Sequence, residues 1–503
     1  MQVVTKVVLN TIVLYVKIMV SMVIALVSVP LILKALGASD YGLYNLVAGI
    51  VTMLAFLNNS MTVSSQRYMS VAMGEGNNDN IDNIYNTSFI LHLILAFIVF
   101  ICLEIIGVPS ISNLNIESDR IWCAQLIFQF LVISTFSKII SVPFDAIMNA
   151  HEDMLAFSVI ELTESGLMLT IAIVLQYIPI DKLAFYGFCI ALIALFTLFM
   201  KYGWCKLKYR RYQISFRRKI DRTLLKDMSG FAGWNLFGGL ALMGRNQGVA
   251  IVFNLFLGTL ANAAYGVANH INGALSQFSS TFQRAINPQL MKSEGMRNRK
   301  RLFKIALITS KFSILALSLF AIPLIVLMDD VLLIWLNDNI PPYTSELAQC
   351  ILVMSIVTQG SMGLMSAIQA TGQIKNYQIT MGCLILTNVP LAYILLKLDY
   401  PIYYVTIGFI IIEMISLIVR IFMAKHLMGL SIQLFFRNVI YPVVLVIIVS
   451  LIACLIPYYL ANNIYLRLIS VCVTYGITYL IMMWFFALEK EQRKTILSKF
   501  KIQ

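Results

Sequence analysis

Fourteen long apolar runs follow one another along this chain, and they restrict its fold more than any other feature. A helix needs about 20 apolar residues to cross the hydrocarbon core of a bilayer. Only 12% of the residues are charged, which is roughly half the fraction typical of soluble domains. The runs predict an all-α integral membrane protein with about fourteen transmembrane helices. They lie near 8–33, 41–66, 84–107, 121–145, 153–177, 182–204, 231–256, 265–288, 304–327, 346–370, 376–397, 402–424, 439–460 and 466–487.

The positions of Lys and Arg predict the orientation of these spans. If the N-terminus is cytoplasmic, the cytoplasmic connections hold 27 Lys and Arg residues and the outer connections hold five. Cytoplasmic loops of membrane proteins carry such an excess. An even number of spans returns the chain to its starting side, so we expect both termini in the cytoplasm.

The formal net charge of +13 therefore reflects topology and attraction to anionic headgroups rather than nucleic-acid binding. The eight cysteines are scattered without a CxxC pair, and the four histidines have no ligand spacing. The chain also lacks a phosphate-binding glycine loop and a sizeable segment outside the membrane for catalytic residues. We expect no metal, no cofactor and no enzymatic activity, which leaves a transporter, a flippase or a channel.

A polar stretch at 205–226 separates the first six spans from the remaining eight. Short motifs recur in the same order at the second span of each half. They are Leu36-Gly37, Tyr41-Gly42 and Gln66-Arg67 in the first half, and Leu257-Gly258, Tyr265-Gly266 and Gln283-Arg284 in the second. The pattern predicts two pseudo-symmetric six-helix lobes related as parallel repeats, with two extra C-terminal helices. The expected divisions are 1–208, 209–425 and 426–503.

Two cations lie near the middle of apolar runs, Lys17 in the first and Arg245 in the seventh. A cation at the bilayer centre costs about 2.5–3.5 kcal/mol and persists where water, protein or a ligand compensates it. Each of the two lies in the first span of one half of the chain, and this pairing predicts a polar cavity for an anionic headgroup. Arg67 and Arg284 are further candidates for this role, although each lies near a cytoplasmic end, where it can simply extend to the interface.

Polar residues recur at helical spacing along the first, second and eighth spans, and the seventh span adds one more. The candidate cavity-lining residues are Asn10, Ser21, Asn59, Asn235, Asn269, Asn272 and Ser276. Residues of these types in membrane helices also hydrogen-bond to neighbouring helices, so packing is the alternative for each of them.

Few acidic residues lie within the spans. Glu161 and Glu164 share a face of the fifth span, and Glu413 lies near the middle of the twelfth. Glu164 and Glu413 are candidates for a site that binds a coupling proton or sodium ion. A structural role is the alternative, for example an ion pair between Glu164 and Lys138, and both readings stay open.

Glycine is dense in the seventh span, where Gly239, Gly244 and Gly248 surround Arg245. Each glycine inside a helix costs up to about 1 kcal/mol relative to Ala. The cluster predicts either a hinge that bends beside Arg245 or a close helix crossing through Gly244 and Gly248.

Three segments resemble a known family. Leu36-Gly-Ala-Ser-Asp-Tyr-Gly-Leu-Tyr-Asn45 resembles the entry to the second span of the Wzx-type O-antigen and capsular polysaccharide flippases. Residues 143–154 resemble the connection between their fourth and fifth spans, and residues 257–288 resemble their seventh and eighth spans. These flippases belong to the multidrug/oligosaccharidyl-lipid/polysaccharide (MOP) exporter superfamily. The resemblance implies two six-helix lobes around a cavity lined largely by spans 1, 2, 7 and 8.

The resemblance also implies a function. A Wzx-type flippase moves an undecaprenyl-diphosphate-linked oligosaccharide from the cytoplasmic to the periplasmic leaflet of the bacterial inner membrane. Expected partners are this lipid-linked oligosaccharide, membrane lipids, a glycan polymerase and other assembly proteins. Lipid II-type exporters are the nearest alternative. Multidrug members commonly carry a carboxylate in span 1 or 7, and this chain has none there. A second alternative is a non-transporting scaffold for glycan-assembly enzymes.

Overall fold

A computed structural model describes residues 2–52, 55–112, 116, 118–215, 221–336, 340–489 and 492–493. Every element in these ranges is a helix. Eleven helices are long and apolar enough to cross a membrane, or twelve if the bent pair Thr344–Gly360 and Met362–Thr371 forms one span. The prediction of an all-helical membrane protein is confirmed. The run at 41–66 includes residues outside the described ranges, and the runs at 231–256 and 265–288 form one long helix, so the count of fourteen stays a prediction.

The chain forms two compact units. Unit 1 comprises Met1–Gly239 and Met291–Arg297, and unit 2 comprises Leu240–Leu290 and Asn298–Gln503. Unit 1 holds α1 (Gln2–Thr52), α2 (Ala55–Glu75), α3 (Asn78–Cys102), η1 (Leu103–Gly107), α4 (Val108–Ser112), α5 (Ile121–Ala150), α6 (Met154–Val174), η2 (Leu175–Tyr177), α7 (Lys182–Lys208) and both ends of α8 (Arg222–Gly295). Unit 2 holds the middle of α8, α9 (Arg299–Val326), α10 (Met328–Leu336), α11 (Thr344–Gly360), α12 (Met362–Thr371), α13 (Lys375–Leu386), α14 (Asn388–Lys397), α15 (Ile402–Met428), α16 (Ile432–Phe435), η3 (Phe436–Ile440), α17 (Tyr441–Leu460), α18 (Ile464–Met482) and η4 (Met483–Ala487). The predicted division after residues 208 and 425 stays a prediction.

Two glycines interrupt the two longest helices. Gly37 in α1 has φ 79° and ψ 167°, and Gly258 in α8 has φ 78° and ψ −171°. This region of backbone conformation is almost restricted to glycine because it has no Cβ. Both breaks fall in the Leu-Gly motif that recurs in the two halves of the sequence, so the repeated motif corresponds to a repeated backbone feature.

The Tyr-Gly pair after each break is also followed by the same local bond. Asn45 Nδ2 donates to the backbone oxygen of Tyr41 at 2.9 Å, and Asn269 Nδ2 donates to that of Tyr265 at 2.8 Å. Each bond joins residues four apart within a helix. The sequence echo therefore extends to a side-chain contact in each unit.

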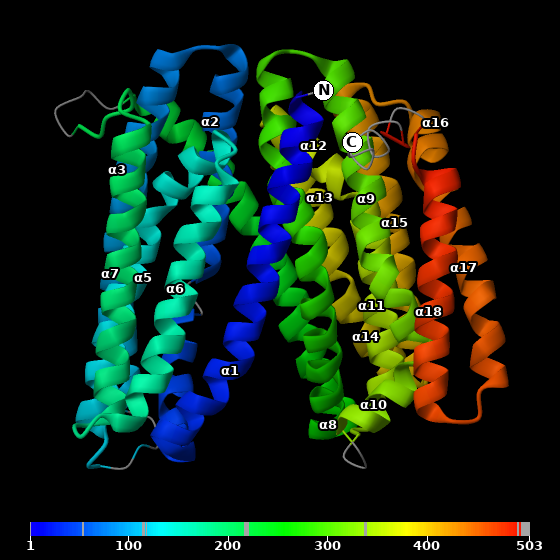
Figure 1. The fold of residues 1–503 in the computed structure, drawn as a ribbon, viewed down its shortest axis with the longest axis horizontal. Helices are drawn as coiled ribbons and strands as arrows, with labels where there is room; N and C mark the ends of the chain where they lie inside the picture. The colour runs from blue at the N-terminus through cyan, green and yellow to red at the C-terminus, as the bar shows by residue number, and fades with distance from the viewer. Residues whose placement is uncertain are drawn as a thin grey trace, which may run out of the picture. The chain divides into compact units, whose positions relative to one another are not determined.

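In unit 1, α5 lies at the centre and contacts α1, α2, α3, α6 and α7 (Figure 1). The short connection between α5 and α6 is held by Asp153. Its carboxylate accepts hydrogen bonds from Trp204 Nε1 at 3.0 Å, Lys208 Nζ at 2.7 Å and the Tyr209 hydroxyl at 2.9 Å. Burial raises the pKa of Asp153, but these bonds outweigh it and hold the pKa below its usual value. The connection thereby fixes where α6 begins.

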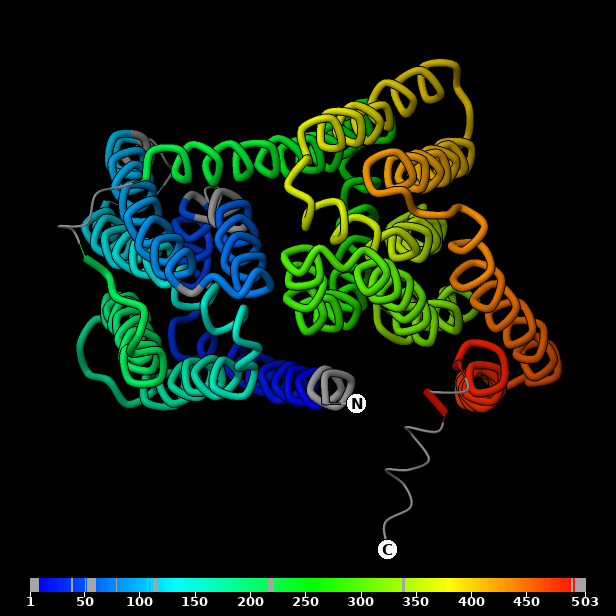
Figure 2. Tube along the Cα trace, turned by 90° about the horizontal axis from the view of Figure 1, so that it is seen from above, coloured from blue at the N-terminus to red at the C-terminus, as the bar shows by residue number. Residues whose placement is uncertain are grey.

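In unit 2, α17 and α18 pack against each other and against α9, and their orange and red tubes lie together at the edge of the unit in Figure 2. Two fully buried tyrosines of α18 join it to α9. The Tyr475 hydroxyl donates to the backbone oxygen of Ser318 at 3.0 Å, and the Tyr479 hydroxyl donates to that of Leu315 at 2.8 Å. The two C-terminal helices are thus attached to unit 2 by buried polar contacts as well as apolar packing.

Candidate functional site

A small polar cavity surrounds Arg245 in unit 2. Its volume is about 70 Å³. The lining residues come from both sides of the break in α8 and from α11, α14 and α15. They are Arg245, Val249, Tyr265, Asn269, Asn272, Ile351, Met354, Ser355, Thr358, Asn388 and Phe409. The structure therefore places three predicted site residues, Arg245, Asn269 and Asn272, around one cavity.

Arg245 has only neutral partners in this cavity. Its Nε and Nη2 atoms donate to Oδ1 of Asn246 at 3.1 and 2.9 Å. No lining residue is acidic, and no carboxylate among the described residues forms an ion pair with Arg245. A guanidinium offers five N–H donors in a planar fork, of which these bonds use part. The site is therefore electropositive and retains donors for an anion.

Amide and hydroxyl groups order the wall of the cavity. Oδ1 of Asn272 accepts hydrogen bonds from the hydroxyls of Ser276, at 3.3 Å, and Ser355. The predicted residue Ser276 thus contacts the cavity through Asn272. Asn388 is buried, and its amide nitrogen donates to the backbone oxygen of Ile385 at 2.7 Å. These contacts fix the orientation of polar groups around the arginine.

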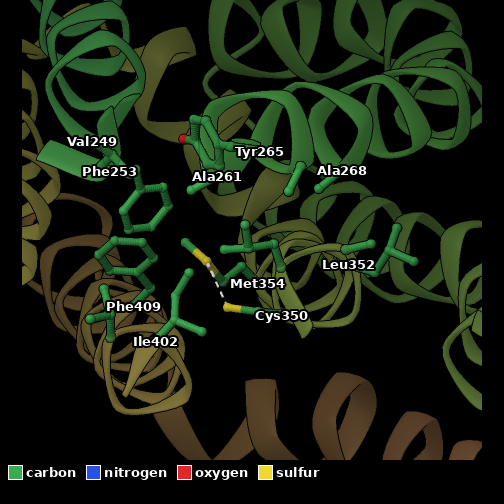
Figure 3. Close-up of a cluster of buried hydrophobic side chains, with 14 of the residues drawn as sticks. Val249, Phe253, Ala261, Tyr265, Ala268, Cys350, Leu352, Met354, Ile402 and Phe409 are labelled. Carbon is green, nitrogen blue, oxygen red and sulfur yellow. Dashed lines mark hydrogen bonds between the residues drawn. The ribbon is translucent and has the colours of Figure 1, made fainter. Parts of the chain in front are cut away.

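Apolar side chains continue from the cavity into the core of unit 2. Figure 3 shows Val249, Tyr265, Met354 and Phe409, which line the cavity, together with Phe253. The rings of Phe253 and Tyr265 meet edge to face with their centroids 5.5 Å apart. A packed aromatic cluster resists rearrangement, so it holds the walls of the cavity in place.

Lys17 in unit 1 has a different environment. Its Nζ atom forms an ion pair with the carboxylate of Glu161 in α6, and the two side chains are 16% and 24% exposed. Elsewhere on the same helix, Asn10 Nδ2 donates to the backbone oxygen of Glu152 at 3.2 Å, and the Ser21 hydroxyl lies 3.5 Å from that of Ser165. The polar stripe predicted on α1 therefore faces α6 and the connection before it.

Glu164 lies one helical turn from Glu161 on α6. It forms no ion pair with Lys138, whose side chain is exposed, nor with any other residue that the structure describes. Both glutamates act electrostatically on Lys201, which is itself paired with Asp145 at 2.8 Å. The sequence suggested Lys138 as the partner of Glu164, whereas the ion pair observed here joins Glu161 to Lys17.

The remaining predicted cations and amides are dispersed. Arg67 is buried and stacks on the rings of Tyr68 and Phe231, with its guanidinium carbon 4.7 and 5.1 Å from the ring centroids. Arg284 is exposed on α8. Asn235 belongs to unit 1 and donates to the backbone oxygen of Phe231 at 3.0 Å. The side chain of Asn59 lies outside the described part of the chain.

Glu413, the second predicted ion-binding acid, is buried in α15 beside an arginine. Arg420 Nη1 lies 3.1 Å from Glu413 Oε1 and donates to the Ser361 hydroxyl at 2.8 Å. Arg420 lies about two turns from Glu413 on the same helix and compensates its charge, so this carboxylate has its counter-ion within unit 2. Among the described residues no group of three or more His, Cys, Asp and Glu side chains is placed to hold a metal ion.

The glycines around Arg245 lie within a regular stretch of α8, whose break is at Gly258. A Cβ atom added at Gly248 would lie 2.7 Å from Cγ2 of Val389, and one at Gly244 would lie 3.3 Å from Cδ2 of Leu386. At Gly239 a Cβ atom would meet nothing within 4 Å. Gly248 thus allows close packing of α8 against α14, whereas Gly239 has no neighbour that requires it.

Sequence reasoning missed several lining residues. Ser355 and Thr358 are three apart on α11, and Asn388 begins α14 where the eleventh predicted run is interrupted. The spacing of Ser355 and Thr358, and the Asn-Val-Pro interruption after Thr387, are signals that could have identified them.

Comparison with known proteins identifies the family. Residues 7–294, more than half of the chain, match the sequence profile of the family described as polysaccharide biosynthesis protein. The chain belongs to this family. A search of curated proteins gives no match.

Solved structures identify the fold. A MOP superfamily transporter from Pyrococcus furiosus, described by a binding pocket of reverse polarity that suggests a different function, aligns with TM-score 0.71 and 17% identity over 84% of this chain and 95% of its own. An outward-facing multidrug resistance MATE family transporter aligns with TM-score 0.72 and 17% identity over 84% and 95%. A MATE structure in the straight conformation aligns with TM-score 0.69 and 19% identity over 84% and 96%. This is a multi-pass membrane protein with the fold of MOP transporters.

Proposed function

We propose that this protein is a Wzx-type flippase, which moves an undecaprenyl-diphosphate-linked oligosaccharide from the cytoplasmic to the periplasmic leaflet of the bacterial inner membrane. The observation that carries the proposal is the cavity at Arg245, where a guanidinium that pairs with none of the described carboxylates lies among amides and hydroxyls. Family membership in polysaccharide biosynthesis supports the choice of substrate class.

The chemistry of the cavity suits a diphosphate linkage. Arginine binds phosphate through paired, charge-assisted hydrogen bonds. The cavity of about 70 Å³ is small, so it suits a single phosphate group rather than a whole oligosaccharide. The second amide hydrogen of Asn269 is a further donor for the remaining oxygens. The hydroxyls of Ser355 and Thr358, which donate to Asn272 Oδ1 and to the backbone oxygen of Met354, would have to turn towards the phosphate to donate to it. The prenyl chain would stay in the lipid during transport, so it would not have to enter the cavity.

The membrane potential favours outward transfer of such a substrate. A dianion that moves outward from an inside-negative potential of about 100 mV is stabilised by about 5 kcal/mol, at about 2.3 kcal/mol per charge. We propose that the transfer follows alternating access, with the glycine-rich part of α8 as its flexible segment. We also propose fourteen spans with both termini in the cytoplasm. A reporter that matures only in the periplasm would contradict this topology if it became active at the C-terminus.

The positive charge of the cavity at Arg245 argues against a multidrug exporter. A cation in the cavity repels cationic drugs, and the Pyrococcus furiosus transporter with reverse pocket polarity is a precedent in this fold for a difference of this kind. A lipid II-type exporter would use the same phosphate chemistry, because lipid II is also a polyprenyl diphosphate.

The test replaces Arg245 in a deletion strain without paralogues and in proteoliposomes. Arg245→Gln should lower the rate of flipping by about ten- to a hundredfold, because hydrogen bonds to charged groups contribute about 1.5–3 kcal/mol. Arg245→Lys should retain part of the activity, since it keeps the charge and loses the fork. Arg437→Gln, at an exposed arginine of η3 outside the cavity, is the matched control. Normal surface glycan with Arg245→Gln would exclude the proposal and favour a scaffold. Flipping of lipid II alone would favour the lipid II-type alternative.

A further inference from the structure

Five charged side chains lie together in unit 1, within the helices α1, α5, α6 and α7. Lys17 is paired with Glu161, and Lys201 is paired with Asp145 at 2.8 Å. Glu164 is the fifth member and, within the described residues, forms no ion pair of its own. The cluster therefore holds three carboxylates and two ammonium groups.

This cluster has no spare positive charge. If an anionic phosphate takes the place of Glu161 at Lys17, the Glu161 carboxylate loses its counter-ion. The remaining ammonium group, Lys201, already compensates Asp145. Glu161 would then lie one turn from Glu164 without a counter-ion of its own, and two neighbouring carboxylates favour protonation of one of them. The pair lies near the surface of unit 1, where a ligand can reach it, because Lys17 and Glu161 are 16% and 24% exposed.

We propose that Glu161 is a proton-accepting counter-ion that competes with the substrate for Lys17. In the empty state the Lys17 ammonium pairs with the Glu161 carboxylate. On binding, a phosphate oxygen replaces that carboxylate at Lys17, and Glu161 takes up one proton from water to become neutral. No covalent bond other than the new O–H bond forms. The inference rests on the proposed function and names a proton as the ion that binds to the same transporter together with the substrate.

The charged groups around Glu161 are consistent with this exchange. α1 presents Lys17, α5 presents Asp145, and α7 presents Lys201, which feels both Glu161 and Glu164. Lys138 of α5 is exposed and forms no ion pair with either glutamate among the residues described. Lys17 is thus the only described cation in contact with Glu161. The bound complex would carry one negative charge fewer than the substrate itself.

The test measures proton uptake directly. The full-length protein in detergent is titrated with farnesyl-diphosphoryl-N-acetylglucosamine, a diester whose phosphates stay fully ionised in the working range. Calorimetry in buffers of different ionisation enthalpy gives the number of protons taken up per ligand. We expect uptake approaching one proton, and affinity that falls as the pH rises, by up to about tenfold per pH unit.

The variant Glu161→Gln should bind the probe more tightly than the parent, take up no proton and show no pH dependence. Glu104→Gln, at a carboxylate of η1 that accepts a hydrogen bond from Gln129 at 3.2 Å, is the matched control and should behave as the parent. Binding by the parent without proton uptake would overturn this inference alone, and it needs no variant to fold. Failure of the parent to bind the probe would overturn the proposed function and this inference with it.

Discussion

Lys17 and Arg245 are similar in sequence but different in structure. Each is a cation near the middle of an apolar run that opens one half of the chain. Lys17 lies against a carboxylate, and the polar stripe of α1 contacts α6. Arg245 lies in a cavity with neutral polar walls, and Asn269 and Asn272 face that cavity. One cation is compensated by a carboxylate of the protein, whereas the other has only neutral partners among the described residues.

The contrast shows that a cation within a span does not by itself identify a binding site. Its counter-charge decides its role, because a buried charge either has a partner in the protein or takes one from a ligand. Arg245 is therefore the primary phosphate contact in our proposal. Lys17 is a second contact whose availability depends on Glu161.

The largest expected effect is on stability. Lys17→Ala removes the counter-ion of Glu161, and a charge left in a span costs about 2.5–3.5 kcal/mol. Arg245→Ala leaves no described carboxylate without a partner. It removes hydrogen bonds to Asn246 but also removes a cation from a span, so the two effects offset each other and the net cost should be about 1 kcal/mol or less. Thermal unfolding of the purified variants in detergent measures both.

The double variant Lys17→Ala/Glu161→Ala provides the control for this comparison. It removes both charges and should recover most of the stability lost in Lys17→Ala, because the interaction is pairwise. Equal destabilisation by Lys17→Ala and Arg245→Ala would mean that the two sites are energetically alike, and the contrast between them would fail.

The second prediction concerns a variant in which Arg245 gains a carboxylate partner, as Lys17 has in unit 1. Thr358→Glu introduces a carboxylate at a lining position, where it can compensate Arg245. The affinity for farnesyl-diphosphoryl-N-acetylglucosamine should fall by about ten- to a hundredfold, or about 1.4–2.8 kcal/mol. Thr358→Gln has a similar shape without the charge and should retain most of the affinity. Similar losses in both variants would indicate a steric effect instead.

Much of the fold could be predicted from the sequence. Apolar runs of bilayer length identified a helical membrane protein, because no other structure satisfies the backbone in lipid except a closed barrel. The repeated Leu-Gly and Tyr-Gly motifs corresponded to glycine breaks at Gly37 and Gly258. These signals are local in sequence, so a single chain is sufficient to detect them. The superposition of the two halves stays a prediction.

The partners of the candidate residues could not be predicted in the same way. Glu161 is 144 residues from Lys17, and only the packing of α6 on α1 brings them together. The sequence offered Glu164 and Lys138 as a pair, but the side chain of Lys138 is exposed on α5. Asn388 lines the cavity, but few other polar residues lie on its helix, so no polar stripe in the sequence indicated it. Helix rotation decides such contacts, and apolar periodicity in spans that are apolar on every side defines it poorly.

A third prediction concerns the backbone around the two cations and has the smallest effect. Lys17 lies in a run without glycine before Gly37, whereas Arg245 is flanked by Gly244 and Gly248. Gly239→Ala has free space for the added methyl group, so it should stabilise α8 by up to about 1 kcal/mol and slow flipping if this part of α8 bends.

Gly248→Ala is the matched comparison on the same helix. Its Cβ atom would lie 2.7 Å from Cγ2 of Val389, a branched side chain with little freedom to move, so it should destabilise unit 2 by about 1 kcal/mol or more. Thermal unfolding and flipping rates in proteoliposomes distinguish the two effects. If Gly239→Ala flips lipid at the parental rate while Gly248→Ala unfolds more easily, the glycines serve close packing beside Arg245. In that case the part of α8 around Arg245 does not bend during transport, and any motion between the two access states must occur elsewhere.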